Sequence, residues 1–361
     1  MTIIAGARPN FMKIAPIIHT LDEEISKGVN INYRLVHTGQ HYDNNMSGSF
    51  FEQLQIPEPD VNLNCDGGSH AQQTASIMLR FEDELLANPA DLVIVVGDVT
   101  STMACAVVAQ KLHTKVAHIE AGIRSEDWSM PEEINRLITD SITNYFFTTS
   151  KKANENLISN GVDKNSIFFV GNTMIDTLLK YRSSFFAPKI WNELTLAPKE
   201  YIVMTMHRPA NVDEEVQLKL MINGIMQNSR ELPIIFPVHP RTARILKELQ
   251  INHPRLHTTE PLSYFEFNYL VENAKAIITD SGGITEEASI MNIPCMTLRN
   301  NTERPETISL GTNVLVGTNP DQLKKYFDLL FKGDWKKGQP IPKWDGKTSE
   351  RIIKVLVDLY K

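Results

Sequence analysis

The stretch DSGGITEEASIMNIPCMTLRNNTERPETISLG, residues 280–311, decides how we interpret the second half of this chain. The apolar run Ala276–Thr279 comes directly before it and is typical of the end of a buried strand. Two residues with capping oxygens and two glycines then favour a helix start that a ligand can approach closely: Asp280, Ser281, Gly282 and Gly283. We expect a helix from about Ile284, and the free amides and dipole at its start would bind an anion.

Charged side chains complete this stretch. Glu286 and Glu287 fall in the first turns of the expected helix, where a carboxylate can accept hydrogen bonds from both hydroxyls of a ribose. A later loop adds charges of both signs: Arg299, Glu303, Arg304 and Glu306. Its arginines are candidates for binding phosphate. Phosphate donors and a diol acceptor in one short region predict a site for a nucleoside diphosphate. The simpler alternative is a capped helix followed by a charged surface loop.

Length and composition narrow the class of protein. The chain has 361 residues, 42% of them hydrophobic, which suits two domains with separate cores. Its net charge of −7 argues against nucleic acid as the main partner. The three cysteines are widely spaced and match no zinc motif, so we expect a reduced, cytoplasmic protein. The strand-like run at the start of the sequence leads us to expect no signal peptide, and the absence of a run of 18 apolar residues predicts no membrane span.

Two carboxylates follow two neighbouring strands of the expected first domain. Asp98 comes just after the apolar run Asp91–Val96, and Glu120 comes directly after Val116–Ile119. Open α/β sheets bind ligands at the carboxyl ends of their strands, so we expect both side chains at one ligand-binding edge. For each carboxylate alone, a helix cap or a turn residue is the alternative interpretation.

Cations and a further carboxylate are expected near the same edge. Arg8 and Lys13 lie around the start of the helix that follows the first strand. Pro131 starts another helix, in which Glu132 and Arg136 stand four residues apart, share one face and can pair. Solvated surface charges are the alternative for a lone Arg or Lys.

The second half repeats the alternation of strands and helices. His207 stands at the end of the expected strand Tyr201–Thr205. Leu262 and Phe267 lie on the loop and helix before Ala276, where they can hold a uracil ring by stacking and backbone hydrogen bonds. For Phe267, a place in the hydrophobic core is an equal alternative.

Several motifs together resemble the non-hydrolysing UDP-N-acetylglucosamine 2-epimerases, which have the glycosyltransferase-B architecture. The motifs are TGQH in residues 38–41, HIEAGIR with PEEINR in 118–136, HRPAN in 207–211, and DSGGITEEA with TERPE in 280–306. HRPAN departs from the family's HRREN at its middle positions, and this departure leaves the substrate subclass open. The resemblance extends from Arg8 to Gly317.

The resemblance and the patterns above together assign roles to particular residues. The expected catalytic residues are Asp98, Glu120, Glu132 and His207. The expected substrate-binding residues are Arg8, Lys13, Arg136, Leu262, Phe267, Ser281, Gly282, Gly283, Glu287 and Arg304. Some members of the family bind a second UDP-sugar as an activator, and the residues that we expect at such an allosteric site are Gln40, His41, Arg208 and His239. We expect no metal and no cofactor.

We therefore expect an α/β protein of two Rossmann-like domains with a deep cleft between them, as in the glycosyltransferase-B architecture. Residues 1–170 form the first domain, which carries the catalytic carboxylates, and residues 171–348 form the UDP-binding domain. Residues 349–361 form an amphipathic helix, which commonly crosses back to the first domain in this architecture.

The activity that the resemblance implies is reversible C2 epimerisation of UDP-N-acetylglucosamine to UDP-N-acetylmannosamine. UDP is eliminated to give a 2-acetamidoglucal and is then added back. The enzyme would act as a cytoplasmic homodimer on a UDP-sugar and feed cell-surface polysaccharide synthesis. Four alternatives stay open: a 2-epimerase of UDP-2,3-diacetamido-glucuronic acid, a hydrolysing epimerase, a glycosyltransferase of the same architecture, and a non-catalytic UDP-sugar sensor.

Overall fold

The computed structural model describes residues 1–39, 51–212, 214–238 and 240–360. The chain forms two compact units. The first unit comprises Met1–Thr177 together with Pro342–Lys361, and the second comprises Leu178–Ile341. No helix within the described ranges is long and apolar enough to cross a membrane.

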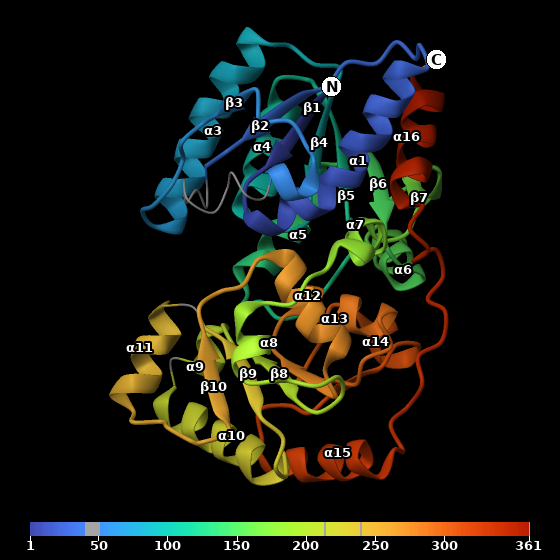
Figure 1. The fold of residues 1–361 in the computed structure, drawn as a ribbon. Helices are drawn as coiled ribbons and strands as arrows, with labels where there is room; N and C mark the ends of the chain where they lie inside the picture. The colour runs from blue at the N-terminus through green and yellow to red at the C-terminus, as the bar shows by residue number, and fades with distance from the viewer. Residues whose placement is uncertain (40–50, 213, 239, 361) are drawn as a thin grey trace. The chain divides into compact units, whose positions relative to one another are not determined.

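Within the described residues, the sheet of the first unit has seven parallel strands in the order β3-β2-β1-β4-β5-β6-β7 (Figure 1). The strands are β1 (Thr2–Ala5), β2 (Arg34–His37), β3 (Val61–Asn62), β4 (Leu92–Val96), β5 (Lys115–Ile119), β6 (Tyr145–Thr148) and β7 (Ile167–Phe169). The near-continuous apolar run of β4 is fully buried, as a central parallel strand requires. The strand order reverses between β1 and β4, which is where sheets of this kind bind ligands.

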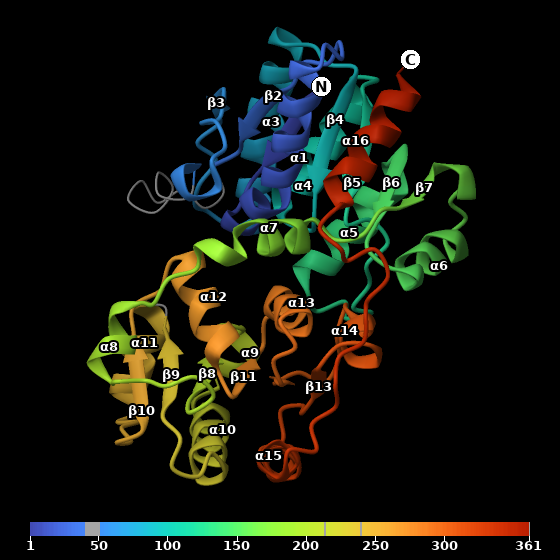
Figure 2. The same ribbon diagram turned by 45° about the vertical axis from the view of Figure 1, so that its right-hand side comes forward.

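Helices cover the sheet of the first unit (Figures 1 and 2). They are α1 (Arg8–Ser26), α3 (His70–Ala87), α4 (Thr100–Lys111), α5 (Pro131–Ile142), α6 (Lys151–Ser159), α7 (Thr173–Tyr181) and α16 (Thr348–Leu359), with a 3-10 turn at Lys164–Ser166. Helix α1 packs against α16, while α4 packs between α3 and α5. The Asp176 carboxylate accepts the backbone N–H groups of Thr348 and Ser349 at 3.1 and 2.7 Å, which ties the start of α16 to α7.

The second unit has a parallel sheet of its own, which in the described residues runs β10-β9-β8-β11-β12-β13. The strands are β8 (Ile202–Thr205), β9 (Ile234–Pro237), β10 (Leu256–Thr259), β11 (Ala276–Thr279), β12 (Cys295–Thr297) and β13 (Asn313–Leu315). Here the order reverses between β8 and β11, so the loops after these two strands meet at the expected ligand-binding position.

The helices of the second unit are α8 (Lys189–Glu193), α9 (Pro209–Val212), α10 (Glu215–Asn228), α11 (Pro240–Glu248), α12 (Tyr264–Asn273), α13 (Gly282–Ile290), α14 (Pro305–Ser309) and α15 (Asp321–Lys332), with a 3-10 turn at Arg182–Ser184. Helix α10 packs against α15, and α13 packs against α14 (Figure 2). The apolar core includes Met204, Phe236, Ile278 and Met296. The fold class expected from the sequence, α/β with two Rossmann-like sheets, is confirmed.

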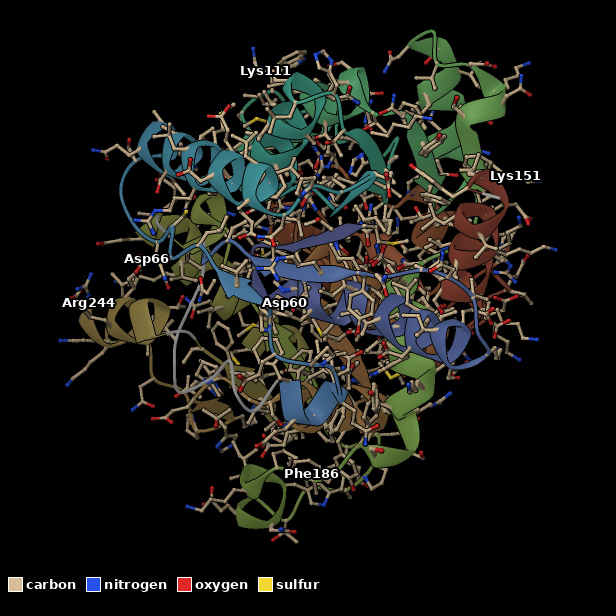
Figure 3. All side chains as sticks on the ribbon, turned by 90° about the horizontal axis from the view of Figure 1, so that it is seen from above. Asp60, Asp66, Lys111, Lys151, Phe186 and Arg244 are labelled. Atoms are coloured by element: carbon tan, nitrogen blue, oxygen red, sulfur yellow. The ribbon has the colours of Figure 1, made fainter. Side chains whose placement is uncertain are left out.

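Charged side chains of both signs point outward from the surface (Figure 3). Lys111, Lys151 and Arg244 are exposed, as are Asp60 and Asp66. These labelled charges come from widely separated segments, which agrees with the dispersed charge of the sequence.

Candidate active site

Glu120 and Lys13 form an ion pair at the ligand-binding edge of the first sheet. Glu120 follows β5, is buried, and accepts a hydrogen bond from Lys13 Nζ of α1 at 2.7 Å. Its backbone has φ of 70°, a left-handed conformation that costs energy for any residue with a Cβ and is often found at functional sites. Gly97, after β4, has φ of 69°, and a Cβ there would lie 3.0 Å from Lys13 Nζ. Glycine therefore lets the Lys13 ammonium lie against the turn that carries Asp98.

Helix α5 holds Asp98 in place. Arg136 Nη2 and Nε lie 2.7 and 3.1 Å from Asp98 Oδ2, and Asn135 Nδ2 donates to the Asp98 carbonyl oxygen at 2.9 Å. Arg136 Nη1 pairs with Glu133 Oε2 at 2.5 Å. Glu133 faces the protein interior while Glu132 is exposed, and the pair between Glu132 and Arg136 stays a prediction.

Four of the expected site residues lie partly or wholly outside the description. Arg8 begins α1, but its side chain is not among the described ones. Gln40, His41 and His239 fall outside the described residues. The expected allosteric site is thus described only at Arg208, whose Nη2 lies 3.5 Å from Glu303 Oε1.

A histidine–aspartate pair occupies the corresponding edge of the second sheet. Asp280 follows β11, is fully buried, and accepts the backbone N–H groups of His207 and Arg208 at 3.0 Å each. Its carboxylate also lies 3.0 Å from Asn211 Nδ2 and 2.7 Å from His207 Nδ1. Burial alone would raise the pKa of Asp280, but the hydrogen bonds and the charge of His207 lower it to about 2. The His207 side chain is 58% exposed, so the pair presents its imidazole outward.

The start of α13 differs in detail from the expectation. The helix begins at Gly282, two residues before Ile284, and Ser281 makes no side-chain capping bond. Asp280 does not cap the helix either, because its oxygens bind the loop after β8. Among the described residues, the nearest atom to a methyl group on Gly282 would be Glu303 Oε2, at 3.9 Å, so they leave the backbone here open to approach.

Carboxylates are packed closely behind this helix start. Tyr264 Oη donates to Glu287 Oε1 at 2.6 Å, and both residues are buried. Burial raises the pKa of Glu287 to about 7, although the hydrogen bond from Tyr264 opposes the shift. Burial likewise raises the pKa of Glu306 to about 7, against the attraction of Arg304.

The two arginines of the loop after β12 form ion pairs with nearby glutamates. Arg299 Nη1 and Nη2 bind the two oxygens of Glu303 at 2.7 and 2.9 Å, in a bidentate arrangement. Arg304 forms an ion pair with Glu286. Half-buried Leu262 lies on the loop before α12, and half-buried Phe267 lies within that helix.

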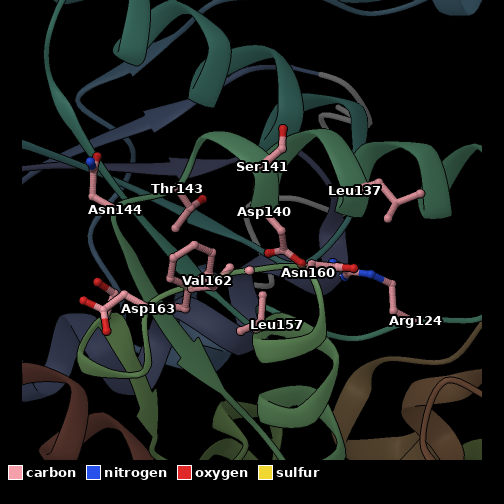
Figure 4. Close-up of a pocket in the computed structure, with 13 residues that line it drawn as sticks. Arg124, Leu137, Asp140, Ser141, Thr143, Asn144, Leu157, Asn160, Val162 and Asp163 are labelled. Atoms are coloured by element: carbon pink, nitrogen blue, oxygen red, sulfur yellow. Dashed lines mark hydrogen bonds and ion pairs between the residues drawn. The ribbon is translucent and has the colours of Figure 1, made fainter.

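One pocket of the first unit, of about 610 Å³, lies away from these residues (Figure 4). It is lined by side chains that include Asp140, Asn144, Asn160 and Arg124, and none of the expected catalytic or substrate-binding residues lines it. Asp140 pairs there with Arg124 at 2.6 Å and also with buried His118 at 2.7 Å. Burial opposes ionisation of Asp140, but these two partners lower its pKa.

Among the described residues, no group of three or more His, Cys, Asp or Glu side chains could hold a metal ion.

Sequence patterns miss three contributors to these clusters. The sequence predicts that Asp280 caps the following helix, whereas in the structure its carboxylate accepts the hydrogen bonds that hold the loop at His207. Glu133 reads as a favourable charge in the first turn of a helix, and Tyr264 carries no motif at all. For Glu133, the three-residue spacing to Arg136 is the one local signal that points to the observed pair.

Two parallel sheets whose strand order reverses, with Asp98 and Glu120 at the carboxyl ends of strands in one and the His207–Asp280 pair at the switch point of the other, define an α/β protein of two Rossmann-like units. The sequence profile of the family "UDP-N-acetylglucosamine 2-epimerase" matches residues 23–357. The chain belongs to this family of isomerases, as the sequence motifs indicate.

Individual relatives agree with this assignment. The UDP-N-acetylglucosamine 2-epimerase of Methanocaldococcus jannaschii is 41% identical, over 99% of this chain and 98% of that protein. The UDP-2,3-diacetamido-2,3-dideoxy-D-glucuronate 2-epimerase of Pseudomonas aeruginosa is 38% identical, over 90% of this chain and 89% of that protein. The crystal structure of the M. jannaschii epimerase in complex with UDP-GlcNAc and UDP has a TM-score of 0.89 and 40% identity, over 100% of this chain and 99% of that one.

Proposed function

We propose that this protein reversibly converts UDP-N-acetylglucosamine to UDP-N-acetylmannosamine by inverting the configuration at C2. The observation that carries the proposal is the likeness, over the whole chain, to the M. jannaschii epimerase crystallised with UDP-GlcNAc and UDP. The 41% identity to the same enzyme supports it independently of the coordinates. The placement of Asp98 and Glu120 after the neighbouring strands β4 and β5, beside the switch point between β1 and β4, supports a proton-transfer reaction.

The second unit is assigned to the nucleotide. The amides at the start of α13, with Ser281, Gly282 and Gly283, would hold the diphosphate together with Arg304. Glu287 would accept the ribose hydroxyls, and the raised pKa of this group makes its ionisation, and so its strength as an acceptor, sensitive to pH near neutrality.

The chemistry at C2 explains why a diphosphate must be held during the reaction. The C2 proton has no neighbouring carbonyl, so removing it directly would leave an unstabilised carbanion. Elimination avoids this difficulty: a base takes the C2 proton, the C1–O bond breaks towards the β-phosphate oxygen, and a C1=C2 double bond forms. Protonation of C2 from the opposite face and attack on C1 by a β-phosphate oxygen of the retained UDP then give the epimer.

The first unit is assigned to proton transfer. Asp98, Glu120 and Glu132 are the candidates for the base and the acid, and such groups typically contribute about 100- to 10,000-fold to turnover. Their negative charge would also stabilise the positive charge that develops at C1 as UDP leaves. His207, oriented by Asp280 through Nδ1, is assigned to the departing diphosphate.

A second substrate deserves a direct comparison because a diacetamido-glucuronate epimerase is 38% identical. We expect UDP-N-acetylglucosamine to be epimerised at least about 10-fold faster than UDP-2,3-diacetamido-glucuronic acid when both are followed by proton NMR at equal concentration. The reverse order would replace the proposed substrate with the alternative. The homodimer, the cytoplasmic location and the role in polysaccharide synthesis stay predictions.

A further inference from the structure

Glu133 is a buried carboxylate that is fixed by the loop before α5. Its Oε2 accepts hydrogen bonds from the Ser125 backbone N–H at 2.9 Å and from Ser125 Oγ at 3.1 Å. Its Oε1 accepts the Glu126 backbone N–H at 3.1 Å. Three donors from two successive residues hold both oxygens, so the carboxylate has little freedom to turn.

The same carboxylate sets the orientation of a guanidinium. Arg136 Nη1 lies 2.5 Å from Glu133 Oε2, while the Nε–Nη2 edge of Arg136 faces Asp98 Oδ2 at 3.1 and 2.7 Å. A guanidinium is planar and rigid, so fixing Nη1 also fixes the direction of the opposite edge. Arg136 therefore bridges one carboxylate of the protein framework and one carboxylate of the proposed catalytic set.

Burial makes this bridge matter. The Arg136 side chain is 5% exposed and that of Glu133 is 3% exposed, so water cannot replace a lost partner on either of them. Removing one member of a buried, hydrogen-bonded pair leaves the other with an unpaired charge or donor. A change at Glu133 should thus be transmitted to Arg136 and from there to Asp98.

We propose that Glu133 is a positioning residue, which acts through Arg136 to hold the Asp98 carboxylate in its reactive orientation. This inference rests on the proposed function, because it gives Asp98 a part in proton transfer. Glu133 itself stays behind Arg136 and is assigned no contact with the substrate. If Glu133 served only to secure the Ser125–Glu126 loop, its loss would lower stability without a specific effect on Asp98.

A double-mutant cycle separates these two roles. Glu133→Gln replaces an oxygen that accepts hydrogen bonds with an amide group that donates them, and this group would oppose the Arg136 donor. We therefore expect turnover to fall between about 10- and 100-fold with KM nearly unchanged. In an Arg136→Ala background the route to Asp98 is already gone, and the same change should cost less than about threefold. Equal losses in the two backgrounds would overturn the proposal.

The pH profile supplies a readout that a purely structural role would not move. In Glu133→Gln the Arg136 guanidinium is no longer held against Asp98, which disfavours the ionised form of Asp98, so the acid limb of turnover should move to higher pH. Glu133→Asp keeps the charge but draws it back by one methylene, and it should recover part of the turnover. Glu126→Gln is the matched control, because it removes an exposed carboxylate from the same loop and should leave turnover and profile unchanged.

A substrate-free measurement keeps this inference distinct from the proposed activity. The carboxyl carbon-13 signal of Asp98, assigned by its loss in Asp98→Asn, should titrate at higher pH in Glu133→Gln than in the wild type. An unmoved titration would overturn the positioning role even in an active enzyme. A wild-type protein that makes no epimer, yet shows the moved titration, would overturn the proposed function alone.

Discussion

Asp98→Asn, Glu120→Gln and Glu132→Gln should each lower turnover by at least about 100-fold, the lower end of what a lost acid or base costs. Asp98 and Glu120 are held at one sheet edge by Arg136 and Lys13, and Glu132 stands exposed at the first turn of α5. Each substitution is nearly isosteric, so the loss should appear in turnover and leave UDP affinity almost unchanged.

Turnover measured by NMR and UDP affinity measured by calorimetry test this expectation together. Glu155→Gln, on α6 of the same unit, is the control, because its exposed carboxylate makes only a loose 3.9 Å pair with Lys152. Near-normal turnover in all three site variants would remove the carboxylates from the mechanism. A comparable loss in the control would show that the assay responds to charge in general.

Asp280→Asn should destabilise the protein by about 2 kcal/mol at pH 7 and lower turnover by about 100-fold. Asp280 is fully buried and holds the His207 and Arg208 amides, Asn211 and the His207 ring. An asparagine side chain can replace only part of this acceptor set, and its amide group would oppose the Asn211 donor. Urea unfolding and NMR turnover measure the two effects separately.

The contribution of Asp280 to the free energy of unfolding should depend on pH. The pKa of Asp280 is about 2 in the folded protein and about 3.9 in an unfolded chain, so its contribution to stability is complete only above about pH 5. This contribution is lost as the pH falls through the folded-state pKa, because Asp280 then binds a proton in both the folded and the unfolded state. The stability gap between the wild type and Asp280→Asn should therefore narrow between pH 5 and pH 3.

Asp176 is the matched control for that titration. It is also a buried aspartate, but burial raises its pKa despite its hydrogen bonds to Thr348 and Ser349. Ionisation of Asp176 therefore lowers the stability of the fold as the pH rises above the pKa that an unfolded chain gives it. This trend is opposite to the one expected for Asp280. If Asp176→Asn and Asp280→Asn showed the same pH trend, the assigned environment of Asp280 would be wrong.

Much of the fold can be predicted from the sequence because parallel strands buried on both faces are short, continuous apolar runs. The run ending at Val96 and the run ending at Ile119 both locate strands, and Asp98 and Glu120 then follow from chain order. The rule that ligands bind at carboxyl ends of such strands converts these positions into a candidate site.

The pairings inside the site could not be predicted in the same way. Spacing places both Glu132 and Glu133 near Arg136, and the choice depends on which side of α5 the Ser125–Glu126 amides cover. Asp280 and His207 are 73 positions apart, and their contact exists only because β8 and β11 are neighbours in the sheet. Tyr264 meets Glu287 across 23 positions for a similar tertiary reason.

The start of α13 shows the same limit at shorter range. Local rules predict that Asp280 or Ser281 caps the helix, since both residue types commonly do so. The tertiary structure overrides this preference, because the amides after β8 also need an acceptor and Asp280 is the buried carboxylate beside them. A buried donor left unpaired would cost about 1–3 kcal/mol, more than a typical cap contributes.

In the proposed mechanism UDP leaves the sugar and returns while C2 exchanges its proton. Incubating the wild-type protein with UDP-N-acetylglucosamine in deuterated water, with an oxygen-18 label in the C1–O bridge, follows both events at once. We expect UDP-N-acetylmannosamine that carries deuterium at C2, with the label scrambled into non-bridging phosphate oxygens and little free sugar. Product that keeps its C2 hydrogen and its bridging label would contradict elimination and re-addition.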